Sequence, residues 1–82
     1  MYTAEEIRDK TRAYTLTTWS KQGNRNPIVI EKSEGIYYWD KEGKRYTDMS
    51  SQLVNMNLGH SCQDIIDAIH AQADRYCFIS PA

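Results

Sequence analysis

Two segments of the chain place apolar residues at the three- and four-residue intervals of an amphipathic helix. The stronger segment predicts a helix over residues 62–76, with an apolar stripe formed by Ile65, Ile66, Ile69, Ala73 and Tyr76. The weaker segment predicts a helix over residues 4–16. Its apolar positions are sparse, so we expect this first helix to lie at the surface of the protein.

Both predicted helices begin at residues that suit an N-cap. Thr3 followed three residues later by Glu6 forms a capping box, in which side chains satisfy backbone N–H groups of the first turn. Ser61 followed by Asp64 forms a similar pattern, with the carboxylate near the positive end of the helix. The caps therefore support both predicted helix starts.

The middle of the chain has the runs and turn residues of a β-meander. Three short runs rich in β-branched or aromatic residues predict strands over 28–30, 36–39 and 44–49. Gly35 and Gly43 separate these runs, and glycine readily adopts the positive φ that tight turns need. We predict a three-stranded antiparallel meander over 28–49 and a loop over 50–60, where no period is clear. The fold class is therefore α+β, in one unit over residues 1–82.

Composition and charge exclude several classes of protein. The 82 residues carry a formal net charge of −1, which gives no basic footprint for nucleic acid. The longest apolar run is far shorter than the roughly 20 residues of a membrane helix. The polar, acidic start is unlike a signal peptide. Two cysteines are too few for a disulfide scaffold, so we expect reduced thiols in a cytoplasmic protein.

Local motifs assign no catalytic, cofactor-binding or metal-binding residue. Four possible zinc ligands have a spacing that matches no closed zinc pattern: His60, Cys62, His70 and Cys77. The four glycines are scattered, so no phosphate-binding loop opens a helix. Two non-enzymatic alternatives stay open at this point. One is a small interaction domain that uses the aromatic surface of the meander, and the other is a free-standing metal-binding domain.

Read together, residues 26–60 resemble the N-terminal region of class III aminotransferases. Residues 34–40 read Glu-Gly-x-Tyr-x-x-Asp and residues 43–48 read Gly-x-x-Tyr-x-Asp, after a proline at position 27. The run from Ser50 to His60 resembles the family segment that ends in Gly-His. The second helix resembles the following family helix through Ala68, Ile69, Gln72 and Ala73. The resemblance covers nearly the whole chain.

One departure from the family pattern concerns the segment after the meander. Glycine is frequent in the family where Gln52 stands here. The sequence of residues 50–55, Ser-Ser-Gln-Leu-Val-Asn, is similar to that of the taurine–pyruvate and related ω-amino-acid branch of the family. This similarity places the chain nearest to that branch.

The resemblance implies a fold type I enzyme that uses pyridoxal 5'-phosphate. It implies transfer of an amino group from an ω-amino acid or amine to an oxo acid such as pyruvate, in a homodimer. The chain resembles part of the small domain. The family's cofactor-binding large domain, with its Schiff-base lysine, corresponds to sequence beyond these residues. We therefore expect the 82-residue chain to be inactive alone and to need the remainder of an aminotransferase chain as its partner.

The resemblance also implies three substrate-binding residues, which are Trp19, Leu53 and Val54. All three are predicted on irregular segments, where binding residues concentrate. None of the five lysines is expected to be catalytic, because each falls on a helix surface or a turn.

Overall fold

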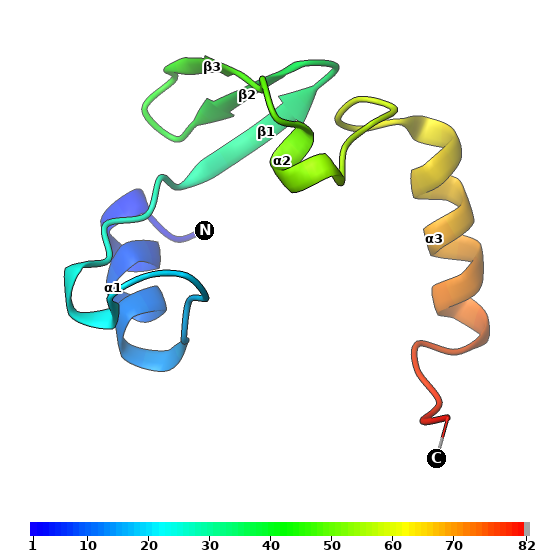
Figure 1. The fold of residues 1–82 in the computed structure, drawn as a ribbon, viewed down its shortest axis with the longest axis horizontal. Coiled ribbons are helices and arrows are strands. Elements are labelled where there is room, and N and C mark those ends of the chain that lie inside the picture. The colour runs from blue at the N-terminus through cyan, green and yellow to red at the C-terminus, as the bar shows by residue number, and fades with distance from the viewer. Residues whose placement is uncertain (82) are drawn as a thin grey trace.

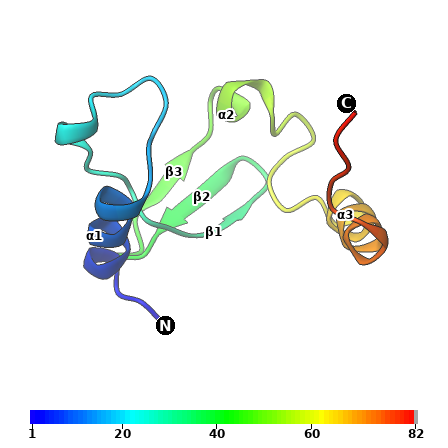
Figure 2. The same cartoon turned by 90° about the horizontal axis from the view of Figure 1, so that it is seen from below.

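The computed structural model describes residues 1–81, which form a small antiparallel sheet with a helix on either side (Figure 1). In chain order the elements are α1 (Ala4–Tyr14), η1 (Gln22–Asn24), β1 (Ile30–Glu34), β2 (Tyr37–Asp40), β3 (Arg45–Thr47), α2 (Ser51–Val54) and α3 (Gln63–Arg75). Two perpendicular views place α1 and α3 at opposite sides of the sheet (Figures 1 and 2). The predicted α+β class, with a helix, a three-stranded meander and a second helix, is confirmed.

Helix α1 begins as the sequence predicts and ends two residues early. The Thr3 side chain accepts a hydrogen bond from the Glu6 N–H at 3.2 Å. The helix stops at Tyr14 because Thr15 is extended, and the Thr15 hydroxyl donates back to the Thr11 carbonyl at 2.7 Å. The guanidinium of Arg25 also donates to a last-turn carbonyl of the helix. The Arg12 carbonyl, which a longer helix would have used, thus accepts from a side chain, and the Thr11 carbonyl accepts the Thr15 hydroxyl in addition to the Thr15 N–H.

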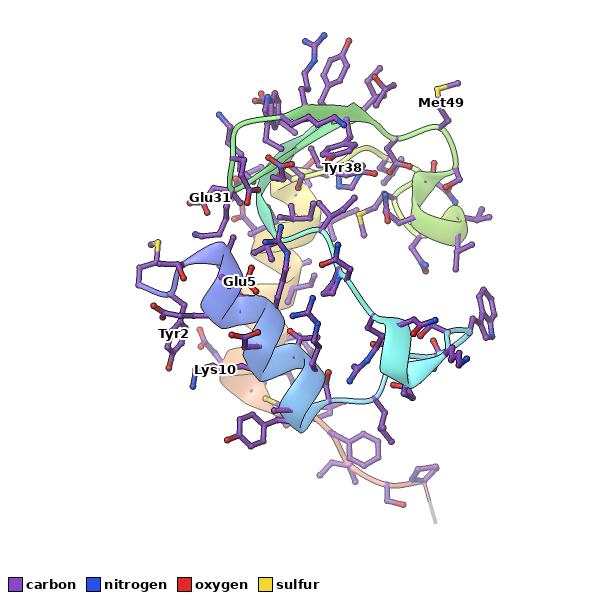
Figure 3. The ribbon with its side chains drawn as sticks, turned by 90° about the vertical axis from the view of Figure 1, so that its left-hand side faces the viewer. Tyr2, Glu5, Lys10, Glu31, Tyr38 and Met49 are labelled. Carbon is purple, nitrogen blue, oxygen red and sulfur yellow. The ribbon has the colours of Figure 1, made fainter. Side chains whose placement is uncertain are left out.

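The three strands pair in sequence order and divide the sheet into two faces. Ser33 pairs with Tyr38, and Tyr38 pairs with Tyr46, so these three residues share one face. On this face the rings of Tyr38 and Tyr46 stack with centroids 5.2 Å apart. The other face carries Tyr37 and Trp39. Figure 3 shows Tyr38 beneath the sheet, on the side that faces the rest of the chain.

The first strand lies further along the chain than predicted. It begins at Ile30 and continues to Glu34, because a tight turn at Gly35 and Ile36 pairs Glu34 directly with Tyr37. Gly35 takes φ +59°, which supplies the positive backbone angle of this turn. The predicted strand over 28–30 therefore ended too early, because the backbone stays extended up to the residue before Gly35.

The loop predicted over 50–60 and the predicted start of the second helix also need correction. Residues 51–54 form a short helical turn, α2. Helix α3 begins at Gln63 with Cys62 at the N-cap, and no side chain caps it. Ser61 is not the cap, because its hydroxyl donates instead to the Ser33 carbonyl at 2.6 Å. A bond to the sheet therefore replaces the predicted local cap.

The interior of the described chain is very small. Val29 is the buried hydrophobic residue and Asp40 the buried charged one. The accessible surface is 7077 Å², whereas a compact 9.5 kDa monomer exposes about 5,000 Å². The Cα radius of gyration is 15.5 Å, against about 12 Å for a compact domain of this length. The chain therefore exposes roughly 2,000 Å² more than a compact monomer of its mass.

Candidate functional site

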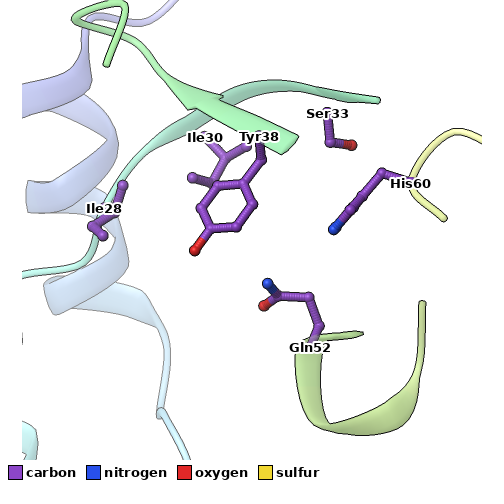
Figure 4. Close-up of a pocket in the computed structure, with 6 residues that line it drawn as sticks. All are labelled: Ile28, Ile30, Ser33, Tyr38, Gln52 and His60. Carbon is purple, nitrogen blue, oxygen red and sulfur yellow. The ribbon is translucent and has the colours of Figure 1, made fainter. Parts of the chain in front are cut away.

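An open pocket of about 350 Å³ lies beneath the sheet face that carries Tyr38. The segment before β1, the strands β1 and β2, the turn α2 and His60 supply its walls. They are formed by Ile28, Ile30, Ser33, Tyr38, Gln52 and His60. Figure 4 shows Gln52 rising from α2 toward Tyr38, with His60 beside them. The pocket thus lies where the sheet meets the segment after β3.

A close ionic hydrogen bond holds the far side of this pocket. The Nε2 atom of His60 lies 2.6 Å from the Oδ2 atom of Asp48. The Asp48 side chain is 4% exposed and the His60 side chain 11% exposed. An ionised carboxylate can only accept hydrogen bonds, so the His60 Nε2 carries the proton of this bond. The pair is therefore a buried anchor between β3 and the start of the α3 segment.

The local hydrogen bonds favour the charged form of Asp48. Burial alone raises the pKa of Asp48, but hydrogen bonds from His60 and from the backbone N–H groups of Ser50 and Gln52 outweigh it. The pKa of Asp48 consequently lies below the ordinary aspartate value. The carboxylate is ionised near neutral pH and serves as an acceptor for three donors.

The turn that Asp48 caps has an unusual backbone. Ser51, Gln52, Leu53 and Val54 all have positive φ, between 51° and 65°. Left-handed backbone costs L-residues roughly 1–2 kcal/mol each, and a β-branched residue such as Val54 is a clear outlier there. Gln52, at φ 51°, stands where glycine is frequent in the resembling family, and glycine carries no such cost. The turn needs support from its surroundings.

Hydrogen bonds support both ends of this left-handed turn. At the start, the Asp48 Oδ1 atom accepts from Ser50 N at 3.2 Å and from Gln52 N at 3.3 Å. At the end, the Asn55 side-chain amide donates to the Gln52 carbonyl at 2.8 Å. The Asn55 N–H also donates to the Ser51 carbonyl at 2.7 Å. Two polar side chains therefore bracket the four left-handed residues.

The three predicted substrate-binding residues lie on the surface in two places. Leu53 and Val54 belong to the left-handed turn and are 65% and 72% exposed. Trp19 lies between α1 and η1, with φ 56° and 89% exposure. Within residues 1–81 its ring makes no aromatic or cation–π contact. Leu53 and Val54 are thus brought together, and their role in substrate binding remains a prediction.

Sequence reasoning missed Asp48 and His60 as partners. Asp48 entered only as part of a family pattern and His60 also as an unmatched zinc ligand, and the two residues stand 12 positions apart. A signal did exist, because an aspartate followed by Ser50 and Gln52 can cap a turn with its side chain. The partner of that aspartate could not be read locally, because His60 reaches it only after the chain folds back onto Gly35.

Four of the five lysines contact a carboxylate or an aromatic ring outside the pocket lining. Lys41 pairs with Glu31 at 2.6 Å. Three other lysines, Lys10, Lys32 and Lys44, lie over aromatic rings. The Lys10 Nζ atom, for example, is 5.1 Å from the centroid of the Tyr2 ring. Figure 3 shows the side chain of Tyr2, which precedes α1, beside that of Lys10 on α1. The pocket lining, taken over the described residues, contains no lysine.

Nowhere in positions 1–81 do three His, Cys, Asp or Glu side chains gather in a way that could hold a metal ion. The helices in this range are too short or too polar to cross a membrane.

Comparison with known proteins identifies the family. The sequence model of class-III aminotransferases matches residues 18–82. Among curated relatives, ornithine aminotransferase of Staphylococcus carnosus is 35% identical over the whole chain, which spans 20% of that protein. Mitochondrial ornithine aminotransferase of Drosophila melanogaster is 41% identical over 56 residues, 68% of the chain and 13% of that protein. The chain therefore spans about a fifth of the length of such relatives.

Solved structures agree with this match. The taurine:2-oxoglutarate aminotransferase of Bifidobacterium kashiwanohense, solved with PLP and glutamate, is 49% identical with a TM-score of 0.83. That comparison covers 99% of this chain and 18% of the enzyme. An S-selective transaminase of Arthrobacter is 33% identical with a TM-score of 0.77, over 99% of this chain and 17% of that one. By sequence and by fold, the chain belongs to the class-III aminotransferase family.

Proposed function

We propose that residues 1–82 form the N-terminal part of the small domain of a cytoplasmic, homodimeric pyridoxal-phosphate transaminase. The reaction moves an amino group from an ω-amino acid or amine to an oxo acid such as pyruvate. The family match over residues 18–82 carries the proposal. Relatives named for ornithine and taurine support the donor class, because each compound has an amino group remote from its acid group.

The residues present do not form a cofactor site by themselves. Four of the five lysines pair with Glu31 or cover aromatic rings, as described above, and the glycines are scattered along the chain. The cofactor, when bound in a complete enzyme, supplies the electron sink for the chemistry. In our proposal the Schiff-base lysine and the phosphate-binding groups belong to the remainder of the enzyme, so the 82-residue chain alone is inactive.

The uncovered surface of α3 supports a missing partner. Ile65 and Ile69 are 42% and 60% exposed along one helix face, and Tyr76 continues that face at 55%. Farther on, Phe78 and Ile79 are about three quarters exposed. Soluble monomers rarely expose so continuous an apolar patch. The remainder of an aminotransferase chain would cover this face and remove the excess surface area.

The alternative of an aromatic interaction surface gains little support from the sheet. Its outer face does carry Tyr37 and Trp39, with ring centroids 6.2 Å apart. However, Lys32 lies 4.7 Å from the Trp39 centroid and Arg45 lies 4.4 Å from the Tyr37 centroid. The rings are covered by cations of the same chain, so they are poorly placed to receive a peptide.

Within the proposed enzyme, Leu53 and Val54 form part of an apolar wall for the amine. They project from a turn whose backbone is fixed at both ends by Asp48 and Asn55. A rigid turn can hold apolar side chains in place against a substrate at little entropic cost. Trp19 is proposed as a third wall residue, supplied by the loop after α1.

A chimera tests the function directly. Residues 1–82 would replace the matching segment of the Bifidobacterium kashiwanohense enzyme, and transamination would be measured with taurine and pyruvate or 2-oxoglutarate. We expect the chimera to be active and the 82-residue chain to be inactive. Leu53→Ala should raise the KM for the amine about tenfold, the scale of one lost apolar contact. Leu16→Ala, at a leucine that is 88% exposed and lies outside the proposed wall, is the control.

Two results would contradict the proposal. A folded, cofactor-loaded chimera without transaminase activity would refute the proposed reaction. An active chimera in which Leu53→Ala and Leu16→Ala have the same KM would remove Leu53 from the substrate wall and leave the reaction itself in place.

A further inference from the structure

The buried pair of Asp48 and His60 has no part in the substrate wall proposed above. We infer that it is a positioning pair, which holds residues 51–54 in the left-handed turn and thereby sets where Leu53 and Val54 face the amine substrate. The statement about the turn stands on the geometry alone. The statement about the substrate rests on the proposed function.

The two carboxylate oxygens of Asp48 have separate tasks. Oδ1 accepts from two backbone N–H groups of the turn, those of Ser50 and Gln52. Oδ2 lies 2.6 Å from His60 Nε2. Oδ1 thus binds the turn, whereas Oδ2 is fixed in place by His60. Because the Asp48 side chain is almost fully buried, water does not readily replace either set of bonds.

His60 is fixed independently of the turn. Its N–H donates to the Gly35 carbonyl at 2.7 Å, and its own carbonyl accepts from Gly35 N at 3.1 Å. Its ring lies 6.0 Å from the ring of Tyr38. The next residue, Ser61, is bonded to the Ser33 carbonyl. The imidazole is therefore fixed relative to the β1–β2 hairpin and holds Asp48 in place. Asp48 in turn holds the backbone of residues 51–54.

The turn depends on such support because its residues carry side chains. Four consecutive residues with positive φ return to right-handed or extended backbone when nothing holds them. A change of that kind would redirect the side chains of Leu53 and Val54. An aspartate at the start of the turn and a fixed histidine behind it oppose the change without touching the substrate.

Substitutions at Asp48 in the chimera test the inference. Asp48→Ala removes both tasks, and we expect the KM for the amine to rise about tenfold, as for Leu53→Ala, with kcat changed by less than about threefold. Asp48→Asn retains an oxygen that accepts from the turn, and its amide can donate to the other tautomer of His60. We expect this conservative variant to restore KM to within about twofold of the parent.

A matched control comes from the other capped turn of the sheet. Asp40 accepts from Glu42 N at 3.0 Å and Lys44 N at 2.9 Å, and from the Tyr46 hydroxyl at 3.1 Å. Asp40→Ala therefore breaks a similar cap that lies away from the left-handed turn. We expect it to lower the melting temperature and leave the KM for the amine unchanged.

Hydrogen exchange separates the two parts of the inference. Asp48→Ala should speed exchange of the Val54 and Asn55 amides, which are hydrogen-bonded within the turn, at least tenfold relative to the parent. Unchanged exchange there would overturn the inference whatever the kinetics show. Faster exchange with an unchanged KM would overturn its substrate part. If Leu53→Ala raises KM and Asp48→Ala does not, the proposed function survives and the positioning pair fails.

Discussion

At each end of the sheet a buried aspartate caps a turn, but the two turns differ in the backbone that the aspartate holds. At one end, Asp40 caps the β2–β3 hairpin through two backbone N–H groups and one side-chain hydroxyl. At the other end, Asp48 caps the turn after β3 through two backbone N–H groups and one imidazole. The pKa of each carboxyl lies below its ordinary value. Burial raises both pKa values, and hydrogen-bond donors lower them by more.

The difference lies in the residues that the two carboxylates hold. In the hairpin, the left-handed position belongs to Gly43, at φ 89°, which adopts it without strain. After β3, four residues with side chains take left-handed backbone. Asp40 therefore adds stability to a hairpin turn that glycine adopts without strain, whereas in our inference the second turn depends on its cap. Strain held in this way is characteristic of sites where side chains must face one direction.

The largest expected effect concerns the glycine that brings His60 to the hairpin. A Cβ at Gly59 would already be in van der Waals contact with the Gly35 backbone at 3.5 Å, so the additional methyl groups of a valine are the atoms that would be crowded there, and φ at Gly59 is 89°. Gly43 has the same φ but open space around it. Gly59→Val should cost about 3 kcal/mol in the local opening free energy, and Gly43→Val nearer 1 kcal/mol. Hydrogen exchange in the chimera measures both. Equal costs would mean that the approach of Gly59 to Gly35 matters little.

A paired substitution should give effects of opposite sign at the two ends. Ser51→Gly relieves one left-handed residue and should raise the local opening free energy by about 1 kcal/mol. Gly43→Ala introduces the same cost into the hairpin and should lower that free energy by about 1 kcal/mol. Exchange of amides within 50–56 and 40–45 reports each end. A loss of stability on Ser51→Gly would contradict the strained turn.

The smallest expected effect is the acid dependence of the two caps. Because each folded pKa is lowered, each carboxylate adds stability that is present above about pH 4 and lost as the pH falls through the folded pKa. Exchange within 50–56 and within 40–45, corrected for the intrinsic pH dependence, should therefore rise in that range. Asp48→Asn should abolish the acid dependence of residues 50–56 alone. If the dependence persists there, another group is responsible.

The amino-acid sequence by itself determined much of the framework. The apolar period predicted both helices, and Gly35 and Gly43 separated three strands in the correct order. The Thr3 cap formed as predicted. These features depend on residues within a few positions of one another, so local propensity and turn chemistry are enough to specify them. The same local order made the family recognisable.

Only the tertiary structure decided the candidate site. The left-handed backbone of 51–54 contradicts local propensity and exists beside a carboxylate held by a histidine 12 residues away. Ser61 satisfies the local rule for a helix cap, yet it bonds the Ser33 carbonyl of the sheet. In each case a contact between distant segments outweighs the preference of the residue itself. Such contacts form only when His60 pairs with Gly35, and no local sequence pattern predicts that pairing.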